Sequence, residues 1–229
     1  MSVANQITAL PALLEALSLA GCVVTADAMG CQREVAGKVR AEGADYVLAL
    51  KGNQGNLHLQ VSTYFDGLIK GGLDPDLEVS DKPLRGRSEV RRCWVAGDLG
   101  WLEGRGDWDG LASVAAVELT RTEKGKTTVE RRYFITSLPA DADRISGAIR
   151  SHWGIENSLH WVLDVAFGED ESRSRTGNAP ENLATLRRLR LHMIKKAPGN
   201  AKASLKSKRK IAGWDNSYLA AIVGQNLDA

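Results

Sequence analysis

The chain has 229 residues, of which 43% are hydrophobic and 25% charged. This composition excludes a wholly disordered protein and is typical of one large globular domain, or of a domain that carries an insertion. The three cysteines form no Cys-x-x-Cys pair, which favours the reducing cytosol. No lysine or arginine precedes Arg33, and no uncharged apolar run approaches membrane-spanning length. We therefore expect a cytoplasmic protein without a signal peptide or a membrane span.

The net charge of +2 hides an asymmetry along the chain. Between Arg187 and Lys210 there are ten basic residues and no acid, so the rest of the chain carries a net charge of −8. A dense basic block beside an acidic body indicates contact with a polyanion. A solvated helix face followed by a flexible tail explains the same pattern, and composition leaves both interpretations open.

The first quarter of the chain alternates helical and strand patterns. Apolar residues at helical spacing, continuous apolar runs and glycine stops predict helix, strand, helix and strand at residues 7–19, 21–27, 31–42 and 45–51. This order implies a parallel pair of strands in an α/β layer. The strands end at Asp27 and Lys51, and open α/β sheets place their chemistry at this carboxyl edge.

A β-rich region follows, and then helical patterns return. Alternating or β-rich segments predict an antiparallel insertion with strands at residues 88–95, 112–120 and 129–138. Helices are predicted at 141–165 and 180–196, and Pro180 with Glu181 forms a favourable helix start. Residues 197–207 are polar, and we expect a mobile tail there.

Two groups of residues are candidates for chemistry. Asp27 is an acid between a buried strand and a tight turn, which suits a metal ligand. The same position suits the cap of the following helix, and both interpretations stay open. On the helix predicted at 141–165, His152, Glu156 and His160 are spaced at i, i+4 and i+8 and therefore share one face. This cluster indicates a site, although a polar stripe on a surface helix has the same spacing.

Conventional catalytic motifs are incomplete in this chain. The segment Gly125-Lys-Thr127 lacks the first glycine of a P-loop, and the glycine-rich segment after Lys51 lacks dinucleotide-binding spacing. The four histidines form no His-Glu-x-x-His motif, which argues against a zinc protease.

Several longer strings occur in a specific order: Asp27-Ala-Met-Gly-Cys-Gln32, Tyr46-Val-Leu-Ala-Leu-Lys-Gly-Asn-Gln54, His152-Trp-Gly-Ile-Glu-Asn157, Leu159-His-Trp-Val-Leu-Asp-Val165 and Gly177-Asn-Ala-Pro-Glu-Asn182. Together they resemble the H-repeat-associated insertion-sequence transposases, which belong to the broad DDE class with an RNase H-like fold. The resemblance extends from about Asn5 to Leu219 and covers nearly the whole chain.

This resemblance implies roles for the two candidate acids. Asp27 is implied as the second acid of the DDE triad and Glu156 as the third. They are implied to bind Mg²⁺ or Mn²⁺, since two-ion chemistry at a phosphodiester uses hard oxygen ligands. The resemblance implies that the partner is DNA, both as transposon ends and as target. It also allows a homo-oligomer, and it implies neither a membrane partner nor a small-molecule substrate.

Further DNA contacts are expected around the glutamate and in the basic block. The wider superfamily pattern Tyr-x2-Arg-x3-Glu-x6-Lys matches only at Glu156, because the other positions hold Ile149, His152 and Leu163. His152 and His160 are candidates to contact phosphates or DNA ends instead. The candidates from the basic block are Arg187, Arg188, Arg190, Lys195 and Lys196.

The first acid of the triad has no counterpart here, since Glu15 is the only acid before Asp27. We therefore expect the carboxy-terminal part of a transposase, with an RNase H-like fold that lacks its first strands and with no activity alone. The alternatives are a non-catalytic DNA-binding remnant or regulator, and a degraded product that does not fold. The expected segments are a partial core, a β-rich insertion, a helical part carrying the glutamate and a basic polar tail, at residues 5–70, 71–139, 140–196 and 197–229.

Overall fold

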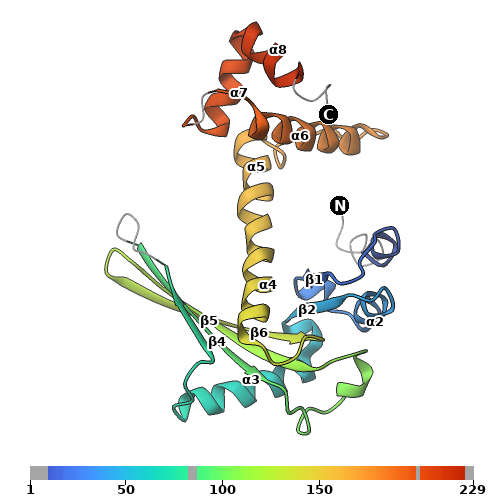
Figure 1. Ribbon diagram of the computed structural model, residues 1–229, viewed down its shortest axis with the longest axis vertical. Helices are drawn as coiled ribbons and strands as arrows, with labels where there is room; N and C mark the ends of the chain where they lie inside the picture. The colour runs from blue at the N-terminus through green and yellow to red at the C-terminus, as the bar shows by residue number, and fades with distance from the viewer. Residues whose placement is uncertain (1–9, 82–86, 200–201, 225–229) are drawn as a thin grey trace. The chain divides into compact units, whose positions relative to one another are not determined.

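The computed structural model describes residues 10–81, 87–199 and 202–224, except for the side chains of Glu156 and Asn157. The chain forms two compact units, Met1–His152 and Trp153–Ala229, which we call the N-terminal and C-terminal units (Figure 1). All strands among the described residues belong to the N-terminal unit.

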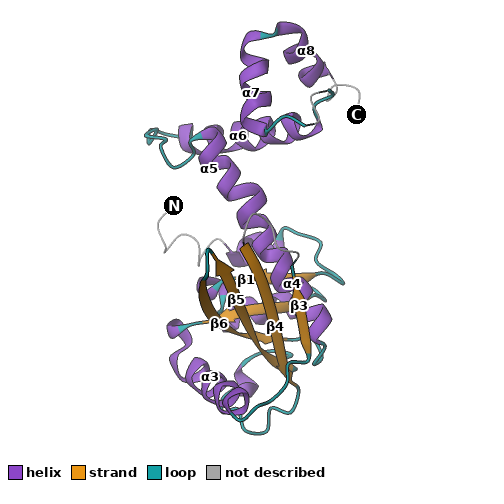
Figure 2. Ribbon diagram, turned by 90° about the vertical axis from the view of Figure 1, so that its left-hand side faces the viewer, coloured by secondary structure: helices purple, strands orange, loops and turns teal. Residues whose placement is uncertain are grey.

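A six-stranded sheet forms the centre of the N-terminal unit (Figure 2). Its strands are β1 (Val23–Ala26), β2 (Asp45–Leu50), β3 (Leu77–Ser80), β4 (Arg87–Ala96), β5 (Ser113–Glu123) and β6 (Lys126–Thr136). They lie in the order β1-β2-β6-β5-β4-β3, with β1 and β2 parallel and every other neighbouring pair antiparallel. The parallel pair and the antiparallel strands expected from the sequence are confirmed. Because β6 pairs with β2, they form one sheet.

Helices cover both faces of this sheet. On one face, α2 (Arg33–Ala41) and α3 (Gly55–Lys70) bury side chains against even-numbered β2 residues such as Leu48. On the other face, α4 (Ala142–Ile155) buries Ile145 and Ile149 against Val47 and Phe134. β2 is therefore buried on both sides, which explains its continuous apolar sequence. The expected α/β class is confirmed.

The C-terminal unit is helical in its described residues. It contains a π-helical segment, η4 (Glu156–His160), followed by α5 (Trp161–Phe167), α6 (Ala179–Lys196), α7 (Leu205–Trp214) and α8 (Asn216–Gly224). Its core brings Leu163 and Ala166 of α5 against Leu191 of α6. Pro180 lies in the first turn of α6, as the sequence predicted. No helix in the described ranges is long and apolar enough to span a membrane.

Three features differ from the sequence expectations. Both α3 and β3 were missed, although Leu57, Val61 and Phe65 of α3 follow a buried i, i+4, i+8 stripe. The expectation of a mobile tail at 197–207 is wrong for residues 204–207, because α7 begins at Leu205 and Ser204 caps it. The expected helix at 7–19 is helical at residues 10–15, and its first three residues lie outside the described ranges.

Candidate functional site

Asp27 lies at the carboxyl end of β1 and faces solvent. Its Oδ1 accepts hydrogen bonds from the backbone N–H groups of Met29 at 3.0 Å and Gly30 at 3.3 Å. It therefore caps the short 3₁₀ helix η1 (Ala28–Gly30) and not the longer helix expected after it, α2, whose cap residue is Gln32. The cap fixes the direction of the carboxylate. Oδ1 accepts both hydrogen bonds, and the Asp27 side chain is exposed. The carboxylate can therefore cap η1 and still bind a ligand.

The turn after β1 is held tightly in place. A Cβ atom on Gly30 would lie 2.6 Å from Cβ of Ala26, so this position of the Asp-Ala-Met-Gly string accepts no side chain without a shift. Asn53, in the 3₁₀ helix η2 (Gly52–Gln54) after β2, donates to the carbonyl of Ala28 at 2.5 Å. Gln54 donates to the carbonyl of Cys31 at 2.9 Å. The loops that follow the two parallel strands are thus bonded to each other.

Cys31 contributes no chemistry at this edge. Its side chain is fully buried, and burial raises the pKa of its thiol to about 12. A buried thiol with a raised pKa stays protonated at neutral pH and is a poor nucleophile.

His152, near the end of α4, contacts β1. Its Nδ1 lies 3.1 Å from Oγ1 of Thr25, a hydrogen bond whose donor depends on the histidine tautomer. Thr25 precedes Asp27 by two residues, so in the extended chain both side chains leave the same side of the strand. The hydrogen bond thus brings His152 close to the carboxyl end of β1.

Glu156 and His160 belong to the C-terminal unit and begin and end the π-helical segment η4. The side chain of Glu156 is outside the described residues. The expected common face of His152, Glu156 and His160 assumed continuous α-helical spacing, and a π turn changes that spacing between Glu156 and His160. Single π turns are frequent at functional sites, which favours the interpretation that this segment belongs to one. Among the described residues, no three histidine, cysteine or acidic side chains gather closely enough to hold a metal ion.

The basic block contains residues with different surroundings. Arg188, Arg190 and Lys196 of α6 are exposed, Arg187 is half-buried, and Lys195 donates to the carbonyl of Ser158 at 3.2 Å. Beyond α6, Lys208 is buried and Arg209 donates to the carbonyl of Ala166. The ten cations are therefore not equally available to a polyanion.

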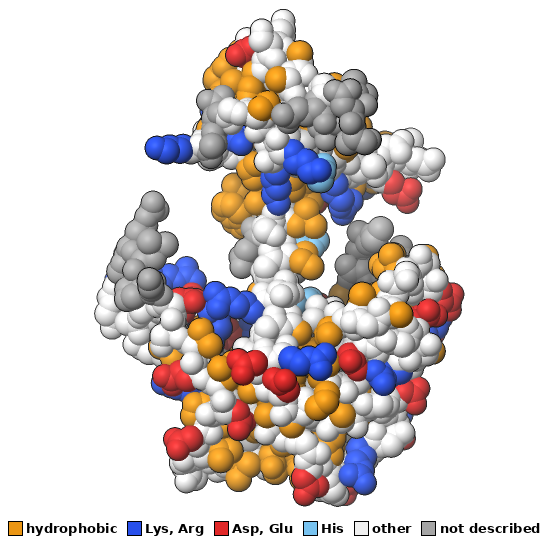
Figure 3. Space-filling model, in the orientation of Figure 1, with side chains coloured by type: hydrophobic (Ala, Val, Ile, Leu, Met, Phe, Trp, Pro, Cys, Tyr) orange, Lys and Arg blue, Asp and Glu red, His pale blue; other side chains and the backbone are white. Residues whose placement is uncertain are grey.

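Sequence reasoning missed a group of arginines on the N-terminal unit. Arg87, Arg91, Arg121 and Arg150 come from three elements and meet around two acids. No spacing in the sequence indicates this cluster, because it depends on strand register and on the packing of α4. Figure 3 shows basic side chains where β4 and β5 approach α4.

Residues 3–194 match the family described as "Transposase DDE domain". The chain belongs to the DDE transposase family. This confirms the resemblance stated from the sequence strings, and it is consistent with the mixed α/β sheet.

Two of three similar curated relatives are named as putative transposases. "Putative transposase YncI" of Escherichia coli O157:H7 is 36% identical over 223 residues, which are 96% of this chain and 57% of that protein. "H repeat-associated putative transposase YhhI" of Escherichia coli K12 is 34% identical over 226 residues, covering 96% and 59%. "Putative protein YbfL" of the same strain has the same identity and coverage as YhhI. The chain thus spans a little under three fifths of the length of these relatives.

Proposed function

We propose that this chain is part of an insertion-sequence transposase with an RNase H-like catalytic core that cuts and joins DNA phosphodiesters. The observation that carries the proposal is the position of Asp27, an exposed and oriented carboxylate at the carboxyl edge of a parallel strand pair. The family match and the names of the relatives support the reaction class.

Asp27 fits a divalent cation by its chemistry. Hard carboxylate oxygens are the ligands that Mg²⁺ and Mn²⁺ prefer, and the two backbone N–H bonds to Oδ1 hold the group in one orientation. We propose Glu156 as a second ligand, on the basis of the resemblance. When bound, the two ions of such a site would activate the attacking oxygen and stabilise the leaving oxygen.

The neighbouring residues of the chain have supporting roles in this proposal. Asn53 and Gln54 bond the loop after β2 to the turn that holds Asp27, so the carboxylate is fixed by two loops. We propose that His152, which is hydrogen-bonded to Thr25, contacts a DNA phosphate near the same edge, and this bond supports the proposal. We propose that His160 and the exposed cations of α6 contact DNA as well.

We also propose that these 229 residues do not cleave DNA alone. The resemblance assigns only the second and third acids to them, and two carboxylates are too few to hold a two-ion site. A DNA-binding regulator without catalysis is the second candidate, favoured by the exposed cations of α6. Metal-dependent nicking by the 229-residue chain, abolished in Glu156→Gln, would contradict the requirement for a further acid.

Calorimetry with Mn²⁺ tests the metal site. We expect weak, roughly millimolar binding to the parent chain, because few ligands are available. Asp27→Asn should abolish it without changing thermal unfolding, since the amide oxygen can still cap η1 while its charge is lost. Asp98→Asn is the matched control, because Asp98 is also exposed and also accepts from a turn N–H, that of Gly100 at 3.0 Å. Binding that survives in Asp27→Asn removes Asp27 from the site and favours the regulator.

A further inference from the structure

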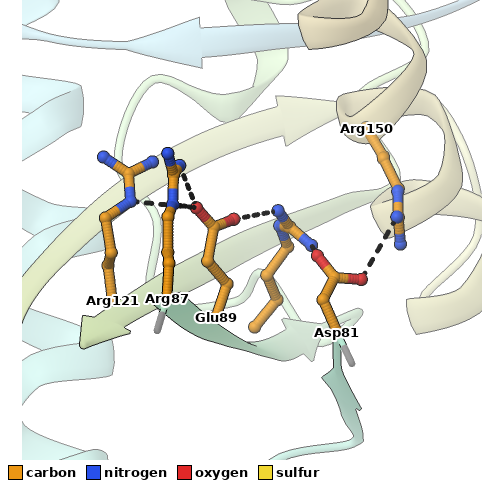
Figure 4. Close-up of polar contacts among 6 residues, drawn as sticks. Asp81, Arg87, Glu89, Arg121 and Arg150 are labelled. Carbon is orange, nitrogen blue, oxygen red and sulfur yellow. Dashed lines mark hydrogen bonds and ion pairs between the residues drawn. The ribbon is translucent and has the colours of Figure 1, made fainter. Parts of the chain in front are cut away.

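Glu89 of β4 is surrounded by three arginines (Figure 4). Its carboxylate accepts from Nε of Arg87 at 2.9 Å, from Nε of Arg121 at 2.9 Å and from Nη2 of Arg91 at 2.6 Å. Its side chain is only 11% exposed. Burial acts to raise the pKa of this carboxyl, but the hydrogen bonds from Arg87 and Arg121 outweigh burial and lower it. Glu89 is therefore ionised at neutral pH.

Asp81, just after β3, extends the cluster to α4. It accepts from Nη1 of Arg91 at 2.6 Å and from Nη2 of Arg150 at 3.3 Å. The hydrogen bond from Arg91 is the main reason that its pKa is lowered. Arg91 thus bridges two carboxylates, and the contacts form one continuous chain of ion pairs from β5 to α4. We call Arg87, Arg91, Arg121 and Arg150 the arginine surface.

The arginine surface carries more positive charge than its acids neutralise. Four guanidiniums meet two carboxylates, which leaves a local charge of +2. Each guanidinium has five N–H donors, so most of the donors do not bond to the two acids. Glu89 is only 11% exposed and lies beneath the arginines, whereas Asp81 is 37%, Arg121 42% and Arg150 60% exposed. The free donors of Arg121 and Arg150 are therefore accessible to solvent, in orientations that the carboxylates fix.

This excess is specific to one face of the sheet. In the β4–β5 register Glu89 is opposite Arg121, so both lie on the face that α4 covers further along the strands. On the other face, Arg92 and Arg131 bond to Glu78, Glu118 and Asp66, which leaves a local charge of −1. Two pairs nearby on the first face cancel, since Arg132 pairs with Glu130 and Glu123 is opposite Lys126. Asp76 and Asp143 lie near Cys93, further along β4.

Stability alone does not account for this arrangement. Burial of Glu89 requires hydrogen-bond donors, but the ion pair between Arg150 and Asp81 joins partly exposed groups and contributes only about 0–1 kcal/mol. Two arginines would satisfy two carboxylates, and each additional guanidinium adds repulsion unless a further anion is present. Guanidiniums in fixed orientations are instead well suited to bind phosphate through paired N–H donors.

We propose that the arginine surface binds phosphates of duplex DNA, as a contact separate from Asp27 and from the cations of α6. The inference rests on the proposed function only in taking DNA as the polyanion. Since the arginine surface would contact phosphates and not base edges, binding through it should be largely independent of the DNA sequence.

Fluorescence anisotropy with a labelled duplex in EDTA, over a salt titration, tests this contact without the metal site. Each phosphate contact contributes about −0.9 to the slope of log K against log salt. Arg121→Gln/Arg150→Gln should therefore bind more weakly and flatten the slope by roughly 2. The control Arg33→Gln/Arg105→Gln removes the same charge from exposed positions elsewhere in the N-terminal unit and should match the parent.

The outcomes separate this inference from the catalytic proposal. Thermal unfolding of each variant excludes misfolding, and Arg150→Gln alone, which breaks a single 3.3 Å contact, should flatten the slope by roughly half as much. Equal slopes for the parent and the arginine variants overturn the inference, as does an equal weakening in the control. Loss of Mn²⁺ binding or of strand cleavage in Asp27→Asn leaves the result in EDTA unaffected.

Discussion

At the scale of single residues, Asp66 of α3 shows how a side chain joins two elements. Its Oδ1 accepts from Nη1 of Arg131 at 2.5 Å and from the hydroxyl of Tyr133 at 2.6 Å, both on β6. Burial acts to raise the pKa of Asp66, but these hydrogen bonds outweigh burial and lower it below its ordinary value of 3.8. The ionised form of Asp66 thus attaches α3 to the sheet.

This contact predicts a dependence of stability on pH. A carboxyl whose pKa falls on folding stabilises the folded state above its unfolded pKa, and the contribution is lost as the pH falls through the folded pKa. We expect Asp66→Asn to lower the free energy of unfolding at pH 7 by about 0.5–1 kcal/mol, a small value because Asp66 is 38% exposed. The difference from the parent should shrink below about pH 4.

Urea unfolding over a series of pH values measures this effect. Asp74→Asn is the control, since Asp74 is an exposed acid in the loop after α3. Parallel stability curves for the parent and Asp66→Asn throughout the acid range would show that the contact does not stabilise the ionised form.

At the scale of elements, β1 is an edge strand of the described sheet. It pairs with β2 on one side, and the residues at its start, Cys22 and Val23, are exposed. Unpaired backbone groups on an apolar edge are a template for pairing with another chain. The sequence expectation of a homo-oligomer therefore has a structural candidate.

We predict that the chain self-associates through β1. Val23→Lys should shift the population toward monomer, because a charged side chain at an edge opposes strand addition. Leu59→Lys is the control, since Leu59 is an exposed leucine on α3 and offers no strand edge. Sedimentation velocity over a range of concentrations measures the shift, and a parent chain that is monomeric throughout contradicts the prediction.

At the scale of the whole molecule, the net positive charge belongs to the C-terminal unit, in which 12 lysines and arginines outnumber 8 acids. Leu191 and Ile194 of α6 are buried, while Arg188, Arg190 and Lys196 are exposed. α6 thus keeps an apolar stripe for its core and a cationic surface for solvent.

We predict that this cationic surface binds DNA without sequence preference. The variant Arg188→Ala/Arg190→Ala/Lys196→Ala should weaken binding to every duplex and flatten the salt slope by about 0.9 for each phosphate that the variant no longer neutralises. Arg33→Ala/Lys70→Ala/Arg105→Ala removes the same charge from exposed positions in the N-terminal unit and serves as the control. Undiminished binding by the α6 variant across the salt titration would identify the block as a solvated helix face.

The sequence by itself determined the local elements and the edge on which Asp27 lies. Continuous apolar runs identified β1 and β2, helical spacing identified α2 and α4, and Pro180 marked the start of α6. Such patterns are readable because periodicity and cap residues report which side of a segment is buried and where it begins.

Only the tertiary structure decided which distant segments meet. The pairing of β6 with β2, the bond between His152 and Thr25 across 127 residues, and the position of Glu89 opposite Arg121 all depend on register and packing. A buried stripe does not specify its partner, and strand register is set by contacts far along the chain. The arginine surface therefore could not be predicted from the sequence, whereas the position of Asp27 at the end of a strand could.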